Sequence, residues 1–82
     1  MRLDKYLKVT RLIKRRTVAN EACDAGKITV NGKIARASYD VKVGEVISVH
    51  FGDRTLAVEV LYVSETAGKA EASLLYREVA AQ

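Results

Sequence analysis

The sequence predicts an α+β protein: two N-terminal helices packed on a small, mainly antiparallel sheet, followed by a short C-terminal helix. Three observations support this class: apolar residues at helical spacing near the start, an Asn-Gly pair between β-forming runs, and two later β-rich runs. With 82 residues, 49% of them hydrophobic, one domain over 1–82 is expected. It would comprise a core motif at 1–51 and, at 52–82, the rest of a second hairpin and the C-terminal helix.

The first helix is indicated by apolar residues on one helical face, namely Leu3, Tyr6 and Leu7. This spacing predicts an amphipathic helix from Arg2 to Thr10. Asp4 lies in its first turn, where a carboxylate suits the positive end of the helix dipole, and is expected to pair with Lys8 one turn later.

The second helix is predicted to begin at Thr17, a residue type that caps helix N-termini well, and to stop at Gly26. Its apolar residues again recur at helical spacing: Val18, Ala19, Ala22 and Cys23. A basic connector, residues 11–16, joins the two helices.

Asn31-Gly32, flanked by Ile28–Val30 and Lys33–Ala35, predicts a β-hairpin because both turn residues accept positive φ. A second hairpin is predicted from the β-rich runs 46–51 and 55–63, which Gly-Asp separates. After a polar loop at 64–69, a closing helix is expected over 70–80, since its apolar residues share one helical face: Ala72, Leu75, Tyr76 and Val79.

Charge is distributed unevenly along the chain. Residues 1–42 carry eleven basic and four acidic side chains, a net charge of +7, whereas residues 43–82 carry three basic and six acidic ones, a net charge of −3. The first sixteen residues alone contain seven cations and one anion. Such a concentration favours a polyanion, because each neutralised phosphate releases counterions. The helix start near Thr17, with Arg15 and Arg16 before it, could hold a phosphate.

Catalysis has little support in the sequence. A metal site needs several ligands, and the chain has one cysteine, Cys23, and one histidine, His50, on different predicted elements. Cys23 is expected to be a buried helix residue and His50 a structural strand residue. Neither Ser38 nor Ser48 lies in a nucleophile motif, and the five glycines are too dispersed for a phosphate-binding loop. No enzyme activity and no cofactor are therefore predicted.

Four blocks of sequence, in order, resemble the alpha-L RNA-binding domain first described in ribosomal protein S four. They are Arg-Leu-Asp-Lys-Tyr-Leu at 2–7, Lys-Arg-Arg-Thr-Val-Ala at 14–19, Ala-Gly-Lys-Ile-Thr-Val-Asn-Gly-Lys at 25–33 and Val-Lys-Val-Gly-Glu at 41–45. As a short stand-alone copy, the chain is similar to the RqcP family of bacterial ribosome-associated quality control. Heat-shock-type factors, which recycle large subunits carrying nascent chain-tRNA, share these blocks and are the alternative.

The resemblance implies a non-enzymatic factor that binds large-subunit ribosomal RNA and peptidyl-tRNA on stalled, split ribosomes. Its protein partner would be the elongation factor that adds C-terminal alanine tails, and a cytoplasmic monomer is expected. The resemblance implies RNA contacts at Arg2, Lys5, Arg15, Arg16 and Lys27, with Arg16 foremost. Together with the charge pattern, this gives the full candidate set for RNA binding: Arg2, Lys5, Lys8, Arg11, Lys14, Arg15, Arg16, Lys27 and Lys33.

Two other classes stay open on the residues alone. A membrane-surface module could use the first helix as a basic anchor, but the apolar face of three residues is small and no membrane partner is predicted. A protein-interaction adaptor could use the acidic half, and this role is compatible with RNA binding by the basic half. Charge alone does not distinguish RNA from DNA, so the preference for RNA comes from the resemblance.

Overall fold

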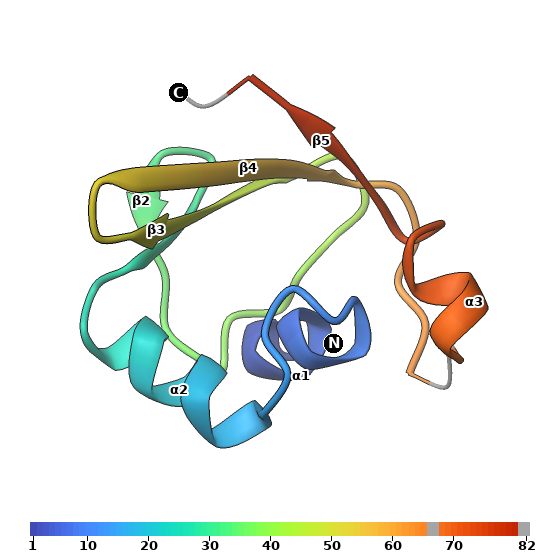
Figure 1. Cartoon of the computed structure of the whole chain (residues 1–82), viewed down its shortest axis with the longest axis horizontal. Helices are drawn as coiled ribbons and strands as arrows, with labels where there is room; N and C mark the ends of the chain where they lie inside the picture. Colours follow the sequence, from blue (N-terminus) through green and yellow to red (C-terminus); the bar gives the residue numbers. More distant parts are fainter. Residues whose placement is uncertain (66–67, 81–82) are drawn as a thin grey trace.

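Two helices, α1 (Leu3–Val9) and α2 (Arg16–Asp24), lie against one face of a five-stranded antiparallel sheet with strand order β2-β1-β3-β4-β5 (Figure 1). The computed structural model describes residues 1–65 and 68–80. The helices and the sheet enclose the core, to which α1 contributes Leu3, Tyr6 and Leu7. The predicted fold class is confirmed except for its C-terminal helix. Within the described residues, no helix is both long and apolar enough to cross a membrane.

The second helix begins earlier than predicted. Arg15 is extended (φ −121°, ψ 133°) and is the N-cap residue, so Thr17 lies inside the first turn and the predicted Thr17 cap is wrong. The reason is that the Arg15 carbonyl already accepts a hydrogen bond from the Ala19 amide at 3.0 Å, in the register that buries Ala19 and Cys23. Packing of this apolar face therefore outweighs the capping preference of threonine.

The first hairpin is confirmed as β1 (Ile28–Val30) and β2 (Lys33–Ile34). Asn31 (φ 52°) and Gly32 (φ 84°) both adopt the left-handed conformation that this tight turn requires. The Asn31 side chain also accepts a hydrogen bond from the Val46 amide at 3.0 Å, which fastens the turn to β3. The second hairpin is confirmed as β3 (Val46–Phe51) and β4 (Arg54–Val60).

The predicted C-terminal helix over 70–80 is wrong. Only α3 (Lys69–Ala72) is helical, and β5 (Tyr76–Val79) pairs with β4 at the right and top of Figure 1. The apolar spacing at 72–79 fitted one helical face, but β4 offers an open edge whose amides and carbonyls need partners. Buried Leu75 anchors the segment, since its carbonyl accepts hydrogen bonds from Tyr6 Oη (2.7 Å) and the Leu61 amide (2.8 Å). In the predicted loop, residues 66 and 67 lie outside the described residues.

The N-terminus is tied to the segment that precedes β3. The Leu3 and Asp4 amides donate to the carbonyls of Tyr39 (2.8 Å) and Ala37 (3.1 Å), and the N-terminal amine lies 2.7 Å from Asp40 Oδ1. These bonds hold the start of α1 beside residues 36–40. Because Arg2 precedes α1 directly, the same bonds fix its position at the junction of α1, α2 and this segment.

Candidate nucleic-acid interface

Two arginines from different helices converge on one buried carboxylate. Arg2 donates from Nε to Asp4 Oδ1 at 3.1 Å and from Nη2 to Oδ2 at 3.3 Å. Arg16 Nε, from the first residue of α2, lies 3.5 Å from Asp4 Oδ2, and the Asn20 amide donates to the same oxygen at 3.3 Å. We call Arg2, Asp4, Arg16 and Asn20 the arginine cluster. Asp4 thus pairs with these residues, and the expected pairing with Lys8 is wrong.

The cluster orients two arginine side chains, and its single carboxylate neutralises only one of their two positive charges. The Asp4 side chain is only 3% exposed, whereas the Arg2 and Arg16 side chains are 50% and 45% exposed. Burial by itself raises the pKa of Asp4, but the hydrogen bonds from Arg2 and Asn20 and the charge of Arg16 together hold this pKa below 3.8. Asp4 is therefore ionised at neutral pH, and one negative charge faces two guanidinium groups on half-exposed side chains.

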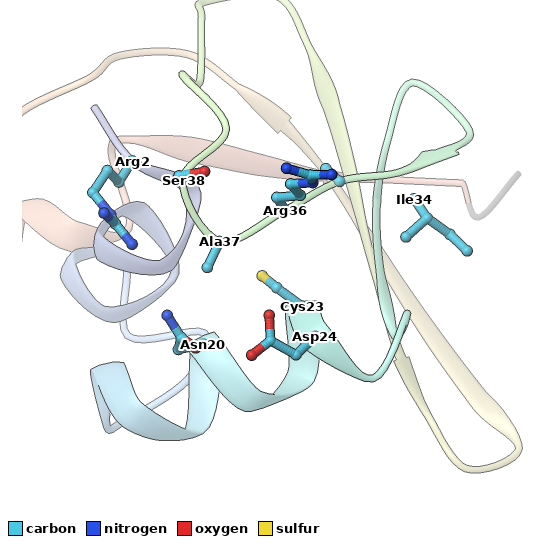
Figure 2. Close-up of a pocket in the computed structure, with 9 residues that line it drawn as sticks. Arg2, Asn20, Cys23, Asp24, Ile34, Arg36, Ala37 and Ser38 are labelled. Carbon is cyan, nitrogen blue, oxygen red and sulfur yellow. The ribbon is translucent and has the colours of Figure 1, made fainter.

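Shallow cavities continue from the cluster across the surface. A groove of about 490 Å³ is lined by Arg2, Asp4, Arg16, Thr17, Asn20 and Glu21. A neighbouring cavity of about 450 Å³ shares Arg2 and Asn20 and lies between α2 and residues 34–38 (Figure 2). In Figure 2, Arg2 and Arg36 lie on either side of Ser38, while Cys23 and Asp24 face them from α2. The arginine cluster is thus one end of a longer concave surface.

The remaining candidate cations do not all gather at this surface. Lys33 lines a third cavity, of about 490 Å³, that continues from residues 34–38 toward the β1–β2 turn. Lys27 lines a separate apolar cavity with Val18 and Phe51, and Lys5 pairs with Glu65 at 3.2 Å. The others are exposed on α1, the connector or the start of α2, and none of them lines the three connected cavities: Lys8, Arg11, Lys14 and Arg15.

Sequence reasoning missed Arg36 and Asn20. Arg36 lines two of the three cavities, and Asn20 bridges Asp4 and the groove. A signal for Asn20 existed, because it lies one helical turn after Arg16 on the same face of α2. For Arg36 the sequence offered only its charge, since nothing indicated that the segment after β2 folds back beside Arg2.

Two of the residues considered for catalysis, Cys23 and His50, make contacts within the fold. Cys23 is buried, and burial raises the pKa of its thiol to about 11, so the unreactive thiol predominates at neutral pH. His50 Nδ1 lies 3.0 Å from Thr55 Oγ1 on the paired strand. Within residues 1–65 and 68–80, no group of His, Cys, Asp and Glu residues is arranged to hold a metal ion.

Comparison with known proteins gives the family. The model described as the S4 domain matches residues 1–47. RQC P-site tRNA stabilizing factor from Halalkalibacterium halodurans is 55% identical over 76 residues, which are 93% of this chain and 86% of that protein. The protein of the same name from Bacillus subtilis is 51% identical and is covered over 88% of its length, again by 93% of this chain.

A solved structure agrees with this assignment at the level of the fold. Heat shock protein 15 of Vibrio cholerae, described as trimeric, superposes with a TM-score of 0.89 at 34% identity, covering 98% of this chain and 82% of that one. Identity is higher to the two tRNA stabilizing factors. The chain therefore belongs to the S4 domain family and, within it, to the group of RQC P-site tRNA stabilizing factors.

Proposed function

We propose that this chain is a non-enzymatic RNA-binding factor of bacterial ribosome-associated quality control. It binds ribosomal RNA of the large subunit and the peptidyl-tRNA on stalled, split ribosomes in the cytoplasm. There it acts as a monomer and keeps the tRNA in place while an elongation partner adds a C-terminal alanine tail. The names of the relatives at 55% and 51% identity support tRNA as a partner, and the basic half of the chain supports a polyanionic partner.

The arginine cluster is the observation that carries this proposal. A guanidinium group binds phosphate best with two parallel N–H donors, and this geometry costs side-chain entropy when the arginine is mobile. Asp4 already holds both arginines from the protein side, through Arg2 Nε at 3.1 Å and Arg16 Nε at 3.5 Å. Their outer donors can then engage phosphates of a structured RNA with little further ordering.

Co-sedimentation with purified large subunits that carry peptidyl-tRNA tests the binding. The double variant Arg2→Ala and Arg16→Ala should lose most binding, whereas Arg54→Ala, an exposed arginine at the start of β4, should bind like wild type. Urea unfolding of each variant checks that the fold persists. If the double variant binds as well as wild type, the cluster is not the interface.

The heat-shock-type role is a second candidate, favoured by the close superposition on heat shock protein 15. The two roles differ in the step after binding. In a reconstituted reaction with the elongation partner and charged alanyl-tRNA, a tailing factor lengthens the alanine tails and Arg2→Ala with Arg16→Ala shortens them. Tail length that is independent of the protein, together with intact binding to subunits, would favour the heat-shock-type role.

A further inference from the structure

We propose that Arg36 is a second phosphate-binding residue, and that an RNA strand lies from the arginine cluster across residues 33–38 toward Lys33. This inference rests on the proposed RNA binding and goes beyond it by assigning a path and a new contact residue. Arg36 belongs neither to the basic N-terminal run nor to the four sequence blocks that indicated RNA binding.

Continuity of the surface is the first argument. The groove at Arg16 and the cavity of about 450 Å³ share Arg2 and Asn20, and that cavity shares Ile34, Arg36 and Ser38 with the next one. A strand that engages the cluster therefore meets a series of adjoining cavities. Cations occur along the whole concave path, in the order Arg16, Arg2, Arg36 and Lys33.

The charge state of Arg36 is the second argument. Ion pairs among residues 1–65 and 68–80 engage Arg2, Arg16, Lys5 and Arg77 but not Arg36. Arg36 is exposed, so its charge is available to an external anion. A phosphate on Arg36 would displace water only and would break no ion pair within the described part of the chain.

The shape of the wall beside Arg36 is the third argument. Its neighbours in the segment, Ala35 and Ala37, are small and buried, which lets a sugar-phosphate backbone approach the chain closely. Across the cavity, Asp24 and Asn20 lie on α2 (Figure 2). A carboxylate repels phosphate but accepts hydrogen bonds from amino groups of bases. At this cavity the strand therefore lies with its phosphates toward Arg2 and Arg36 and its base edges toward Asn20 and Asp24.

Substitution of Arg36 tests the contact. Arg36→Ala should weaken binding to large subunits carrying peptidyl-tRNA by about tenfold, as for loss of a charge-assisted hydrogen bond. It should also make the slope of log affinity against log salt shallower by about one. Arg36→Lys should recover part of the loss, and Arg54→Ala is the matched control. Urea unfolding checks stability, which should not change because the Arg36 side chain is exposed.

The two proposals fail in different ways. If Arg36→Ala binds like wild type while Arg2→Ala with Arg16→Ala does not, the path is wrong and the proposed function stands. If all of these variants bind like wild type, the RNA-binding role of this face is wrong as well.

Directed cleavage tests the path independently. An iron chelate attached to Ser38→Cys should cut RNA beside the cavity, whereas the same chelate on Asp53→Cys, in the β3–β4 turn, should not cut those positions. The native Cys23 is buried and remains unlabelled, which the unsubstituted protein verifies. Equal cleavage patterns from the two attachment sites, or no cleavage from Ser38→Cys, would overturn the proposed path.

Discussion

Asp4 is the residue on which the organisation of the site depends. It accepts hydrogen bonds from Arg2, Asn20 and the Lys5 amide, and it lies within ion-pair distance of Arg16. Negative charge at an RNA-binding surface normally opposes binding. Here the carboxylate is buried beneath the arginines, so its effect is to hold them in place, and the arginines rather than the carboxylate face the solvent.

Asp4→Asn tests this positioning role against a simple charge effect. The substitution keeps the shape but removes the charge that orients Arg2 and Arg16. Although the chain becomes more positive, we expect RNA affinity to fall about tenfold, because two long side chains must then be ordered on binding. Filter binding to a ribosomal RNA fragment at fixed salt measures this change in affinity. A gain in affinity would mean that net charge alone governs binding.

Stability should decrease in acid through the same residue. Because the folded-state pKa of Asp4 is below 3.8, the unfolded chain binds the proton more tightly than the folded chain. The stabilising contribution is therefore complete well above pH 3.8 and is lost as the pH falls through the lowered folded-state pKa. Urea unfolding at several pH values from 7 to below 3.8 should give a smaller acid-dependent loss for Asp4→Asn than for wild type.

Asp40 provides the control for this titration. The N-terminal amine lowers the pKa of Asp40 as well, but the carboxyl side chain is 72% exposed. Solvent weakens an exposed pair of this kind, so Asp40→Asn should keep most of the acid dependence. A wild-type acid dependence in Asp4→Asn would show that Asp4 is not the group responsible.

Among the elements, the β1–β2 hairpin depends on particular residue types, because both of its turn residues have positive φ. Gly32 has a φ of 84°, and an added Cβ would meet no atom within 4 Å, so only backbone strain opposes a side chain there. Gly32→Ala should lower the free energy of unfolding by about 1 kcal/mol. Gly68→Ala is the control, since Gly68 has an ordinary φ of −78°. Equal stability of the two variants in urea would contradict a strain-only cost.

Local signals predicted the elements that depend on local interactions. Both hairpins and the first helix follow from turn chemistry and apolar spacing, and the structure has them within a few residues. The start of α2 and the strand at Tyr76–Val79 depend instead on packing partners far away in the chain. Leu75 illustrates this, because its carbonyl is bonded by Tyr6, 69 residues earlier.

The residues of the candidate site likewise divide into those that local signals identified and those whose placement depends on distant parts of the chain. The basic N-terminal run identified Arg2 and Arg16 as candidates from charge and resemblance. Their convergence on Asp4 could not be predicted, because it needs the relative placement of two helices. Lys5 was a candidate on the same evidence, yet it pairs with Glu65 on a segment that the sequence did not place beside α1. Arg36 could be identified as a candidate only once the path of the chain after β2 was known.

At the scale of the whole molecule, the two halves differ in charge within dimensions of 29 × 26 × 21 Å. If the basic half neutralises about five phosphates, log affinity should fall against log salt with a slope of roughly −3.5 to −4.5. Titration with ribosomal RNA between low and physiological salt measures this slope. A slope near zero would mean that contacts other than phosphates dominate binding.

The acidic half should influence RNA binding only through the long-range field. At 0.01 M salt the screening length is about 30 Å, comparable to the whole molecule, whereas at 0.15 M it is about 8 Å. Replacing two exposed carboxylates far along the chain, Asp53→Asn with Glu78→Gln, should therefore raise affinity about two- to fivefold at 0.01 M salt. At 0.15 M the same variant should bind like wild type. An equal gain in affinity at both salt concentrations would contradict a purely long-range effect, because it would require these carboxylates to lie beside the bound RNA.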